Sequence, residues 1–410
     1  MLPREAWAGV EKRLAVLRPA ELAAELVRIP SHPGVERQEE AAARRLADWL
    51  EAAGVRSRLV EVAPGRPNLL AAVGRRSAGS RSLLLCGHTD TVPPNLGEAG
   101  HGLSGEIREG RLLGRGAADM KGPLAAMAAA LVAVAGALQE GGGEATLAAV
   151  VDEEMESLGA EALVAALARG ELAADGAVVG EPTANRVALG HRGLEWLRVA
   201  FVGRAAHGGA PERGVNAIAA AARFAILVEE RLAPALAARR HALLGPPTIN
   251  LGRIAGGDQP STVAASCTLD LDRRTVPGES FDTVVAELRA LLDEVEAATP
   301  GLRCEVARVQ GGMATLEHRA LLISDEHPLA RAAFAARRAV LPGQVAGPGV
   351  AFPAWTDGAL LSAFAQVPAV VLGPGELGDA HSPRESIEVA ELETAARLYA
   401  RLALEFCVPQ

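Results

Sequence analysis

One apolar segment of this sequence ends in three consecutive acids, and this junction limits the folds that the chain can adopt. Residues Ala145 to Val151 are apolar except for Thr146, as expected of a strand buried on both faces of a sheet. Asp152, Glu153 and Glu154 follow directly. Adjacent acids at the end of a buried strand repel one another and lose hydration, so we expect a compensating positive charge beside them.

The length and composition of the chain predict two domains and argue against a nucleic-acid partner. At 410 residues, the chain exceeds what one hydrophobic core usually serves. Hydrophobic residues make up 49% of it but aromatic residues only 3%, which indicates helices in contact through small side chains. The formal charge of −9 is unfavourable for phosphate binding, which requires a basic face.

The cysteines and the apolar segments indicate a cytoplasmic protein. Cys86, Cys267, Cys304 and Cys407 are scattered without a CxxC pair, which favours buried thiols in a reducing compartment. The N-terminal segment carries charges where a secretory signal would be apolar. Pro123 to Leu138 is short for a membrane span and mostly alanine, so it predicts a buried helix. We therefore expect a soluble protein that does not enter a membrane.

The first part of the chain alternates helical patterns with short apolar segments. This alternation predicts an α/β domain, in which helices cover both faces of a mostly parallel sheet. The expected helices are 18–29, 36–53, 123–138 and 158–168, and the expected strands are SRLVEVA, NLLAAVG, SLLLC, ATLAAVV and GAVV. The pattern returns near the C-terminus, with helices at 327–340 and 389–406 around the strand in QVPAVVLGPG.

A different order of elements occupies the middle of the chain. A strand, a helix, two strands, a helix and a strand follow one another, which is the βαββαβ order of ferredoxin-like domains. The expected strands are 195–201, 248–254, 262–271 and 303–309, and the expected helices are 215–232 and 280–297. We therefore predict one α/β domain, residues 1–189 and 311–410, interrupted by an inserted α+β domain, residues 190–310.

Histidines and acids follow several of the expected strands. Because ligands of open α/β sheets bind at the carboxyl ends of the strands, these positions are candidates for a site. The candidates are His88 and Asp90 after SLLLC, the three acids after ATLAAVV, Glu181 after GAVV, His381 after the last strand, and Asp119 in a glycine-rich loop before a helix. Each residue alone is consistent with an ordinary loop histidine or a helix N-cap.

Taken together, these residues predict a metal centre. The basic side chains nearby are few, Arg115 and Lys121 in one loop and Arg384 in another, so a pair of divalent cations is the simplest compensation for the acids. Imidazole and carboxylate ligands without cysteine suit zinc, and also cobalt or manganese. The Asp90 carboxylate, two residues after His88, is suited to accept the second N–H of that imidazole and fix its tautomer.

The order of motifs along the chain resembles the dinuclear-zinc deacylases and exopeptidases. This family includes acetylornithine deacetylase, succinyl-diaminopimelate desuccinylase, aminoacylase and the glutamate-releasing carboxypeptidases. The motifs are GHTDTVPP, GRGAADMKGP, DEE before Gly159-Ala160, GEPT, GHRG, GRAAHGGAPERGVNAI, DRRTVPGE and GPGELGDAHSPRE, between about residues 80 and 385. The resemblance implies a catalytic α/β domain, an inserted lid and dimerisation domain, and two divalent ions.

The resemblance also implies a role for each candidate at the strand ends. Asp119 would bridge the two ions, with His88 and Glu181 completing one site and Glu154 and His381 the other. Glu153 would be the general base, taking a proton from the water between the ions and returning it to the departing amine. Asp152 would be structural.

Residues elsewhere in the family pattern imply contacts with the substrate. His207 would donate to the oxyanion, commonly in the neighbouring subunit's site, and the inserted domains would form the homodimer. Arg274 would bind the substrate's free carboxylate, although Arg273 could take that role. The backbone N–H of Gly375 could contact the same carboxylate, or the GPG sequence could be only a tight turn.

Two further details follow from the resemblance. The peptide after the bridging aspartate is often cis in the family, so the Asp119–Met120 bond is expected to be cis. Arg384 stands where the family often has Asn, which leaves the substrate contacts of that loop open.

The main interpretation is a metal-dependent hydrolase that cleaves a small N-acyl amino acid. An exopeptidase with the same groups, acting on dipeptides or a C-terminal residue, is the close alternative, and the sequence leaves the acyl group, the amino acid and the native metal open. A non-catalytic relative would have lost ligands or the base, yet all six positions are filled. A metal-free hydrolase is weakly supported, because no GxSxG motif occurs and no cysteine stands beside an evident histidine.

Overall fold

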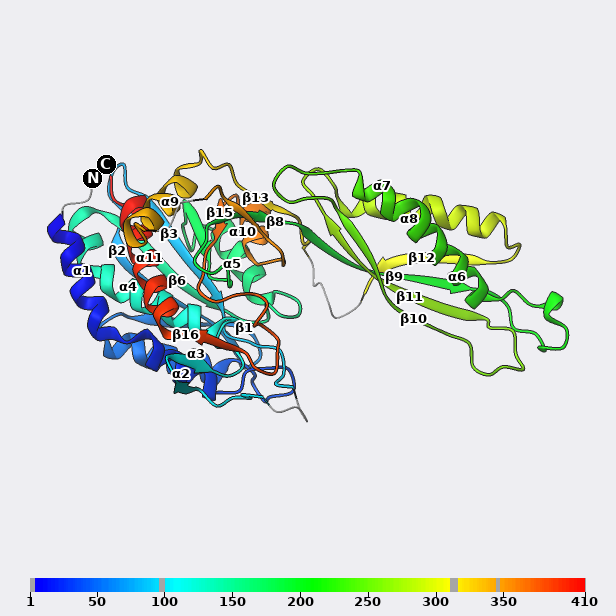
Figure 1. Ribbon diagram of the computed structural model, residues 1–410, viewed down its shortest axis with the longest axis horizontal. Coiled ribbons are helices and arrows are strands. Elements are labelled where there is room, and N and C mark those ends of the chain that lie inside the picture. Colours follow the sequence, from blue (N-terminus) through cyan, green and yellow to red (C-terminus); the bar gives the residue numbers. More distant parts are fainter. Residues whose placement is uncertain (1–3, 96–99, 310–315, 344–346, 410) are drawn as a thin grey trace. The chain divides into compact units, whose positions relative to one another are not determined.

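The computed structural model describes residues 4–95, 100–309, 316–343 and 347–409, and this part of the chain forms two compact units (Figure 1). The first unit comprises residues up to Gly190 together with Leu321–Phe352 and the residues from Thr356 onward. The second comprises His191–Ala320 and Pro353–Trp355. The predicted boundary between residues 310 and 311 lies outside the described residues.

The first unit is built on a mixed sheet with parallel strands at its centre. The strand order is β1-β2-β6-β3-β7-β15-β8-β13, and β14 pairs with β8. These strands are β1 (Ser57–Ala63), β2 (Arg66–Arg75), β3 (Ser82–His88), β6 (Gly143–Val150), β7 (Gly176–Val179), β8 (Ala188–His191), β13 (Leu321–Leu322), β14 (Val350–Phe352) and β15 (Ala369–Val371). Strand β3 is parallel to β6 and β7, and β7 to β15, whereas β2 is antiparallel to both β1 and β6. The predicted mostly parallel α/β sheet is confirmed, with antiparallel pairs toward its edges.

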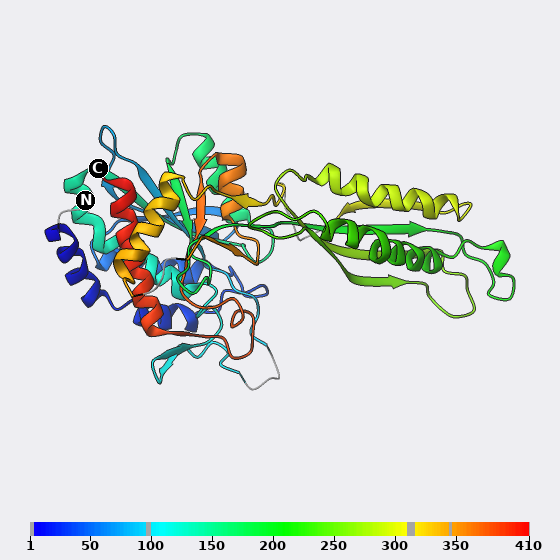
Figure 2. The same ribbon diagram turned by 45° about the horizontal axis from the view of Figure 1, so that its top comes forward.

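Helices cover both faces of this sheet, as predicted (Figure 2). Helices α4 and α11 lie against the strands of one face, with α1, α2 and α9 packed on them and α3 against β1 and β2. The opposite face carries α5 and α10. The bounds are α1 (Arg4–Leu17), α2 (Pro19–Arg28), α3 (Glu40–Ala52), α4 (Lys121–Gly141), α5 (Leu158–Ala168), α9 (Pro328–Val340), α10 (Gly358–Ala365) and α11 (Val389–Cys407).

Helix α4 is the buried helix that the alanine-rich segment predicts. By length and composition it is the one helix of the described chain that could cross a membrane, but 78% of its most apolar window is buried inside the protein. A helix that is apolar on all sides packs in this way at the centre of a large domain. Helix α1 was not predicted, and neither was a small sheet of β4 (Glu106–Arg108), β5 (Arg111–Leu113) and β16 (Ser386–Glu388).

The second unit has the predicted βαββαβ order. Its antiparallel sheet, ordered β10-β11-β9-β12, contains β9 (Gly193–Val202), β10 (Thr248–Gly256), β11 (Ser266–Thr275) and β12 (Arg303–Arg308). A short 3-10 helix (Pro211–Arg213) precedes α6 (Ala217–Leu227), which continues through a π-helical turn (Val228–Leu232) into α7 (Ala233–Ala237). Helix α8 (Phe281–Ala297) begins after Ser280, whose side chain accepts from the Thr283 N–H in a capping box.

One face of the second sheet forms the core of this unit. Buried residues alternate with less buried ones along β11, and the inward side chains pack against α6 and α8. Phe201 of β9 and Phe224 of α6 meet with ring centroids 5.7 Å apart. Trp355 joins this unit because it stacks on His318, with centroids 4.0 Å apart, and donates to the Arg319 carbonyl. The predicted division had placed these three residues in the second α/β segment.

Candidate metal centre

The parallel strands of the first unit bring the predicted ligands to one edge of the sheet. His88 is the last residue of β3, Glu181 follows β7 by two residues, and Glu154 follows β6 by four. Asp119 lies in the loop directly before α4. Because β6, β3 and β7 are neighbours and parallel, their carboxyl ends meet at this edge.

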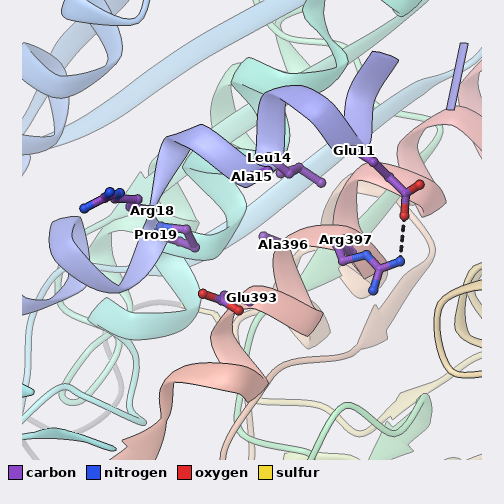
Figure 3. Close-up of a pocket in the computed structure, with 8 residues that line it drawn as sticks. All are labelled: Glu11, Leu14, Ala15, Arg18, Pro19, Glu393, Ala396 and Arg397. Carbon is purple, nitrogen blue, oxygen red and sulfur yellow. Dashed lines mark hydrogen bonds and ion pairs between the residues drawn. The ribbon is translucent and has the colours of Figure 1, made fainter. Parts of the chain in front are cut away.

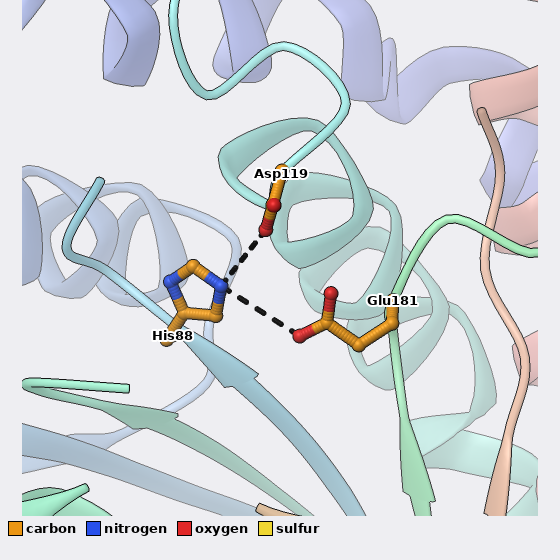
Figure 4. A group of neighbouring side chains, drawn as sticks. All are labelled: His88, Asp119 and Glu181. Carbon is orange, nitrogen blue, oxygen red and sulfur yellow. Dashed lines mark hydrogen bonds and ion pairs between the residues drawn. The ribbon is translucent and has the colours of Figure 1, made fainter. Parts of the chain in front are cut away.

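His88, Asp119 and Glu181 form the first group of converging side chains (Figure 4). One potential ligand atom from each lies within 4.8 Å of the others. The Nε2 atom of His88 is 3.0 Å from Asp119 Oδ1 and 3.6 Å from Glu181 Oε1. All three residues are buried.

Asp119, Glu154 and His381 form the second group. The Nε2 atom of His381 is 3.2 Å from Asp119 Oδ2 and 3.1 Å from Glu154 Oε1. The two oxygens of Asp119 therefore face different histidines, Oδ1 toward His88 and Oδ2 toward His381. A carboxylate arranged in this way can be shared between two cations.

A hydrogen bond at Nδ1 fixes the tautomer of His88, and in the neutral ring the lone pair of Nε2 then faces the acids. Its Nδ1 lies 3.0 Å from the backbone oxygen of Asp90, which can only accept, so Nδ1 carries the hydrogen. The carboxylate of Asp90 had been expected in this role, but it is 3.5 Å from Nδ1. It accepts instead from the backbone N–H groups of Glu153 (3.2 Å) and Glu154 (3.0 Å), and so connects the two strand ends.

These residues fit divalent cations. The buried Oε1 of Glu181 has no hydrogen-bond donor among the described residues, and it faces the lone pair of His88 and the Asp119 carboxylate. Burial and the Asp119 carboxylate hold the pKa of Glu181 well above its ordinary value. Hydrogen bonds to Asp119 and Glu154 raise the pKa of His381 to about 10. Cations between these groups would relieve the clustering of acceptors and negative charge.

None of the three nearby basic residues takes the place of such cations. Arg115 pairs with buried Glu385, and Lys121 donates to the Ile29 carbonyl at 2.6 Å. Arg384 is exposed. Arg115 and Lys121 are therefore committed to other partners, and Arg384 lies at the surface.

Glu385 binds the backbone of the Asp119 loop without belonging to either group of candidate ligands. The sequence interpretation did not select Glu385. Its Oε1 accepts the backbone N–H groups of Gly116 (2.9 Å), Ala118 (3.0 Å) and Asp119 (3.1 Å). Glu385 follows His381 by four residues, so one segment supplies a candidate ligand and fixes the loop of the other. The Asp119–Met120 peptide in this loop is cis, as the resemblance implied.

Glu153 lies beside the two groups and is partly buried. Burial and the Glu181 carboxylate hold its pKa well above the ordinary value. Asp357, just before α10, contributes to this effect, and burial raises the pKa of Asp357 itself to about 7. The sequence interpretation did not select Asp357, because it follows no strand of the parallel set.

In the second unit, the predicted carboxylate-binding arginine is already paired. Arg274 donates to both carboxylate oxygens of Asp272, at 2.7 and 2.9 Å. Its neighbour Arg273 is buried and donates to Glu279 at 2.7 Å and to the Arg274 carbonyl at 2.6 Å. Arg273 is thereby committed to the interior of the unit, and Arg274 is partly exposed.

His207 of the second unit is exposed, and its tautomer follows from one hydrogen bond. The Gly209 N–H donates to its Nδ1 at 3.0 Å, so in the neutral ring Nε2 carries the hydrogen and can donate.

Gly375, in the first unit, has φ +81°. Its N–H donates to Glu391 Oε2 at 2.8 Å. The expected contact with a substrate would require the loss of this bond.

A separate hollow of about 400 Å³ lies between α1, the start of α2 and α11 (Figure 3). Its lining includes Glu11 and Arg397, which pair at 2.6 Å, and Arg18 and Glu393. None of its lining residues is a candidate ligand or base, so it offers no chemistry for the predicted reaction.

Comparison with known proteins identifies the family. The model of peptidase family M20/M25/M40 matches residues 84–405. The chain belongs to this family. It is accordingly a metal-dependent hydrolase of the metallopeptidase and amidohydrolase type.

Curated relatives from this family match nearly the full chain. The acetylornithine deacetylase of Proteus mirabilis (strain HI4320) is 31% identical over 406 residues, which cover 95% of this chain and 97% of that relative. The acetylornithine deacetylase of Aliivibrio fischeri (strain MJ11) is 30% identical over 375 residues, covering 88% and 90%.

Solved structures of M20-type peptidases share the fold. Aminopeptidase PepT from Bacillus cereus superposes with a TM-score of 0.74 at 20% identity, covering 95% of this chain and 98% of that one. The Bacillus subtilis YXEP protein, described as a dinuclear metal-binding peptidase of the M20 family, gives a TM-score of 0.70 at 15% identity, covering 96% and 98%.

Proposed function

We propose that this M20 enzyme is a deacylase that hydrolyses the amide bond of a small N-acyl amino acid with a free carboxylate. The observation that carries the proposal is the 31% identity with an acetylornithine deacetylase over nearly the full length of both chains. The solved peptidases with a similar fold are 15–22% identical, a level that supports the fold alone.

We further propose that two divalent ions, zinc first and cobalt or manganese as alternatives, bind between His88, Asp119, Glu154, Glu181 and His381. Such ions polarise a carbonyl and acidify a water. Asp119 is suited to serve both ions because its two oxygens face the two histidines. The backbone oxygen of Asp90 fixes the His88 tautomer that presents a lone pair.

Glu153 is the proposed general base. Its backbone is held by Asp90, and its side chain lies close enough to Glu181 for their charges to interact. Its carboxylate takes the proton of the attacking water and delivers it to the departing amine nitrogen, which must be protonated to leave. A carboxylate with a raised pKa is a stronger base for the first transfer than an ordinary carboxylate.

We propose that the second unit supplies His207 as a donor to the oxyanion and Arg274 as the partner of the substrate's carboxylate. The donor hydrogen on His207 Nε2 supports the first role. The bidentate bond between Arg274 and Asp272 supports the second, because a substrate carboxylate could take the same fork geometry in place of Asp272.

A homodimer through the second unit is also proposed. Strand β10 lies at an edge of its sheet and is exposed along most of its length. Ile254 on this strand is 55% exposed, and Ile226 on the neighbouring α6 is 53% exposed. An open edge flanked by apolar side chains is suited to pair with a second copy of the chain. A cytoplasmic location, inferred from the four free cysteines, is proposed with it.

The experiment that tests the proposal is an amine-release screen of the zinc- or cobalt-loaded protein, with a chelated control. Acetylornithine, succinyl-diaminopimelate, other N-acyl amino acids and dipeptides would be compared by kcat/KM. We expect an N-acyl amino acid to be hydrolysed best. A preference for dipeptides would establish the alternative, an exopeptidase with the same groups.

A further inference from the structure

The loop that carries Glu153 and Glu154 is held by side chains that lie outside the metal centre. This segment, residues 151–159, contains the connection from β6 to α5 and the first two residues of α5, and is called the loop below. We propose that Arg66 and Asn68 of β2 are positioning residues, which hold this loop so that Glu153 and Glu154 face the centre. The proposal rests on the function proposed above for the two glutamates.

Asn68 closes the base of the loop. Its Oδ1 accepts the Val151 N–H at 3.1 Å, and its Nδ2 donates to the Gly159 carbonyl at 2.8 Å. A direct bond from the Gly159 N–H to the Val151 carbonyl, at 3.0 Å, completes the closure. Asn68 is 2% exposed, so both of its bonds are made away from water.

Gly159 is needed for this closure. A Cβ atom at this position would lie 2.5 Å from both the nitrogen and the oxygen of Val151, and 2.7 Å from Asn68 Oδ1. Because no real side chain tolerates such distances, only glycine lets the two ends of the loop approach. This accounts for the glycine that follows the three acids in the sequence.

Arg66 holds the first acid of the loop. Its Nη2 donates to Asp152 Oδ1 at 2.6 Å, and its Nε donates to Glu39 Oε2 at 2.8 Å. Glu39 is fully buried and Asp152 nearly so, which makes Arg66 the cation that two buried carboxylates share. Arg66 and Asn68 are two residues apart on one strand, so they lie on the same face of β2.

The side chain and backbone of Asp152 connect Arg66 to the rest of the loop through hydrogen bonds. Asp152 has φ +70°, a conformation that Asp and Asn tolerate better than most residues. Its Oδ2 accepts the Glu156 N–H at 3.3 Å, and its carbonyl accepts the Ser157 N–H at 2.6 Å. The acid that sequence analysis assigned to a structural role thus joins Arg66 to the turn containing Glu153 and Glu154.

The loop is therefore attached at three places: its base to Asn68, its first acid to Arg66, and the amides of Glu153 and Glu154 to Asp90. A displacement of about 1 Å in a reacting group can reduce turnover about 100-fold. These contacts position a proton carrier, Glu153, and a proposed ligand, Glu154. Their loss should therefore affect turnover and ion binding more than substrate binding.

The test compares Arg66→Met, Arg66→Lys and Asp152→Asn with the wild-type protein. Arg401→Met is the matched control, because Arg401 also pairs with a carboxylate, Glu405, and its side chain is 16% exposed against 20% for Arg66. Zinc affinity by calorimetric titration, amide hydrogen exchange of residues 151–159 and steady-state kinetics would be measured on each.

The ion site to which Glu154 contributes can be identified as the one that is lost in Glu154→Gln. For Arg66→Met we expect the zinc affinity of this site to fall about 10- to 100-fold, while the affinity of the other site stays unchanged. Amides of the loop should exchange faster, and kcat should fall about 100-fold while KM changes less than about threefold. Arg66→Lys should be intermediate, because one ammonium cannot reproduce both bonds of the guanidinium. Asp152→Asn should have a smaller effect, and Arg401→Met none.

Wild-type ion affinity and loop exchange in folded Arg66→Met would overturn the proposal. If Arg66→Met does not fold, Arg66→Lys and Asp152→Asn test the proposal instead. Wild-type ion affinity and loop exchange in both of these variants would also overturn the proposal. If the wild-type protein hydrolyses no amide in the screen, the proposed function fails. The zinc and exchange measurements then still determine whether Arg66 and its partner Asp152 position the loop.

Discussion

The candidate groups of the two units differ in how far they are prepared for chemistry. In the first unit, His88, Asp119 and Glu181 converge at short distances, and buried hydrogen bonds fix the loops that carry the candidate residues. In the second unit, Arg274 is engaged by its own neighbour Asp272, and His207 is exposed. The comparison indicates that the first unit is preorganised, whereas Arg274 of the second unit must exchange its partner to contribute.

The largest effect is expected in the first unit, at Glu153. Glu153→Gln keeps the size of the side chain but cannot accept a proton, so kcat should fall by about 10²- to 10⁴-fold. Both ions should stay bound, because Glu153 is not among the proposed ligands. Metal analysis and steady-state kinetics of the same sample would check this. Substantial residual kcat would exclude Glu153 as the base.

His207 tests whether the second unit contributes to chemistry at all. Removing one oxyanion donor typically costs about 10²- to 10³-fold in kcat, and we expect this for His207→Ala. If two subunits share each site, mixing His207→Ala with Glu153→Gln should restore part of the activity, since one site of each mixed dimer is intact. Verified mixed dimers without any recovery would contradict a shared site.

Glu385 tests the preorganisation of the first unit without touching a proposed ligand. In Glu385→Ala the amides of Gly116, Ala118 and Asp119 lose their common acceptor. Ion affinity should fall about 10- to 100-fold, as for other partners of metal-binding loops. Unchanged zinc affinity in a correctly folded variant would indicate that the Asp119 loop holds its shape alone.

The smallest effect is expected at the pair of Asp272 and Arg274. Asp272→Asn weakens the partner that competes with a substrate carboxylate, so KM should decrease by a few fold, whereas Arg274→Ala should increase KM by about tenfold. The kcat values should change little. Steady-state kinetics on an N-acyl amino acid would measure both, and equal KM values in the two variants would remove Arg274 from the substrate site.

The strand ends were predictable because each parallel strand has a strong local signature. A buried run such as SLLLC, with a histidine two residues after it, identifies both the strand and the edge at which it ends. Short elements such as β4, β5 and β16 lack a periodic pattern, so three residues of sequence could not predict them.

The supporting contacts were less accessible to sequence reasoning. Glu385 is 266 residues away from Asp119 in the chain, and Arg66 is 86 residues from Asp152, so no local pattern joins them. The Arg274–Asp272 pair is different. Residues two apart on a strand share a face, so the sequence DLDRR contained the signal that this arginine has a local partner.

The central claim is that two cations share Asp119 between the two groups of ligands. Anomalous diffraction from crystals of the zinc-loaded protein tests it most directly. The account predicts two zinc ions per chain, each about 2.0–2.2 Å from its ligand atoms, with one oxygen of Asp119 on each ion. A fully loaded crystal with no zinc between His88, Asp119 and His381, or with zinc bound only elsewhere, would contradict it.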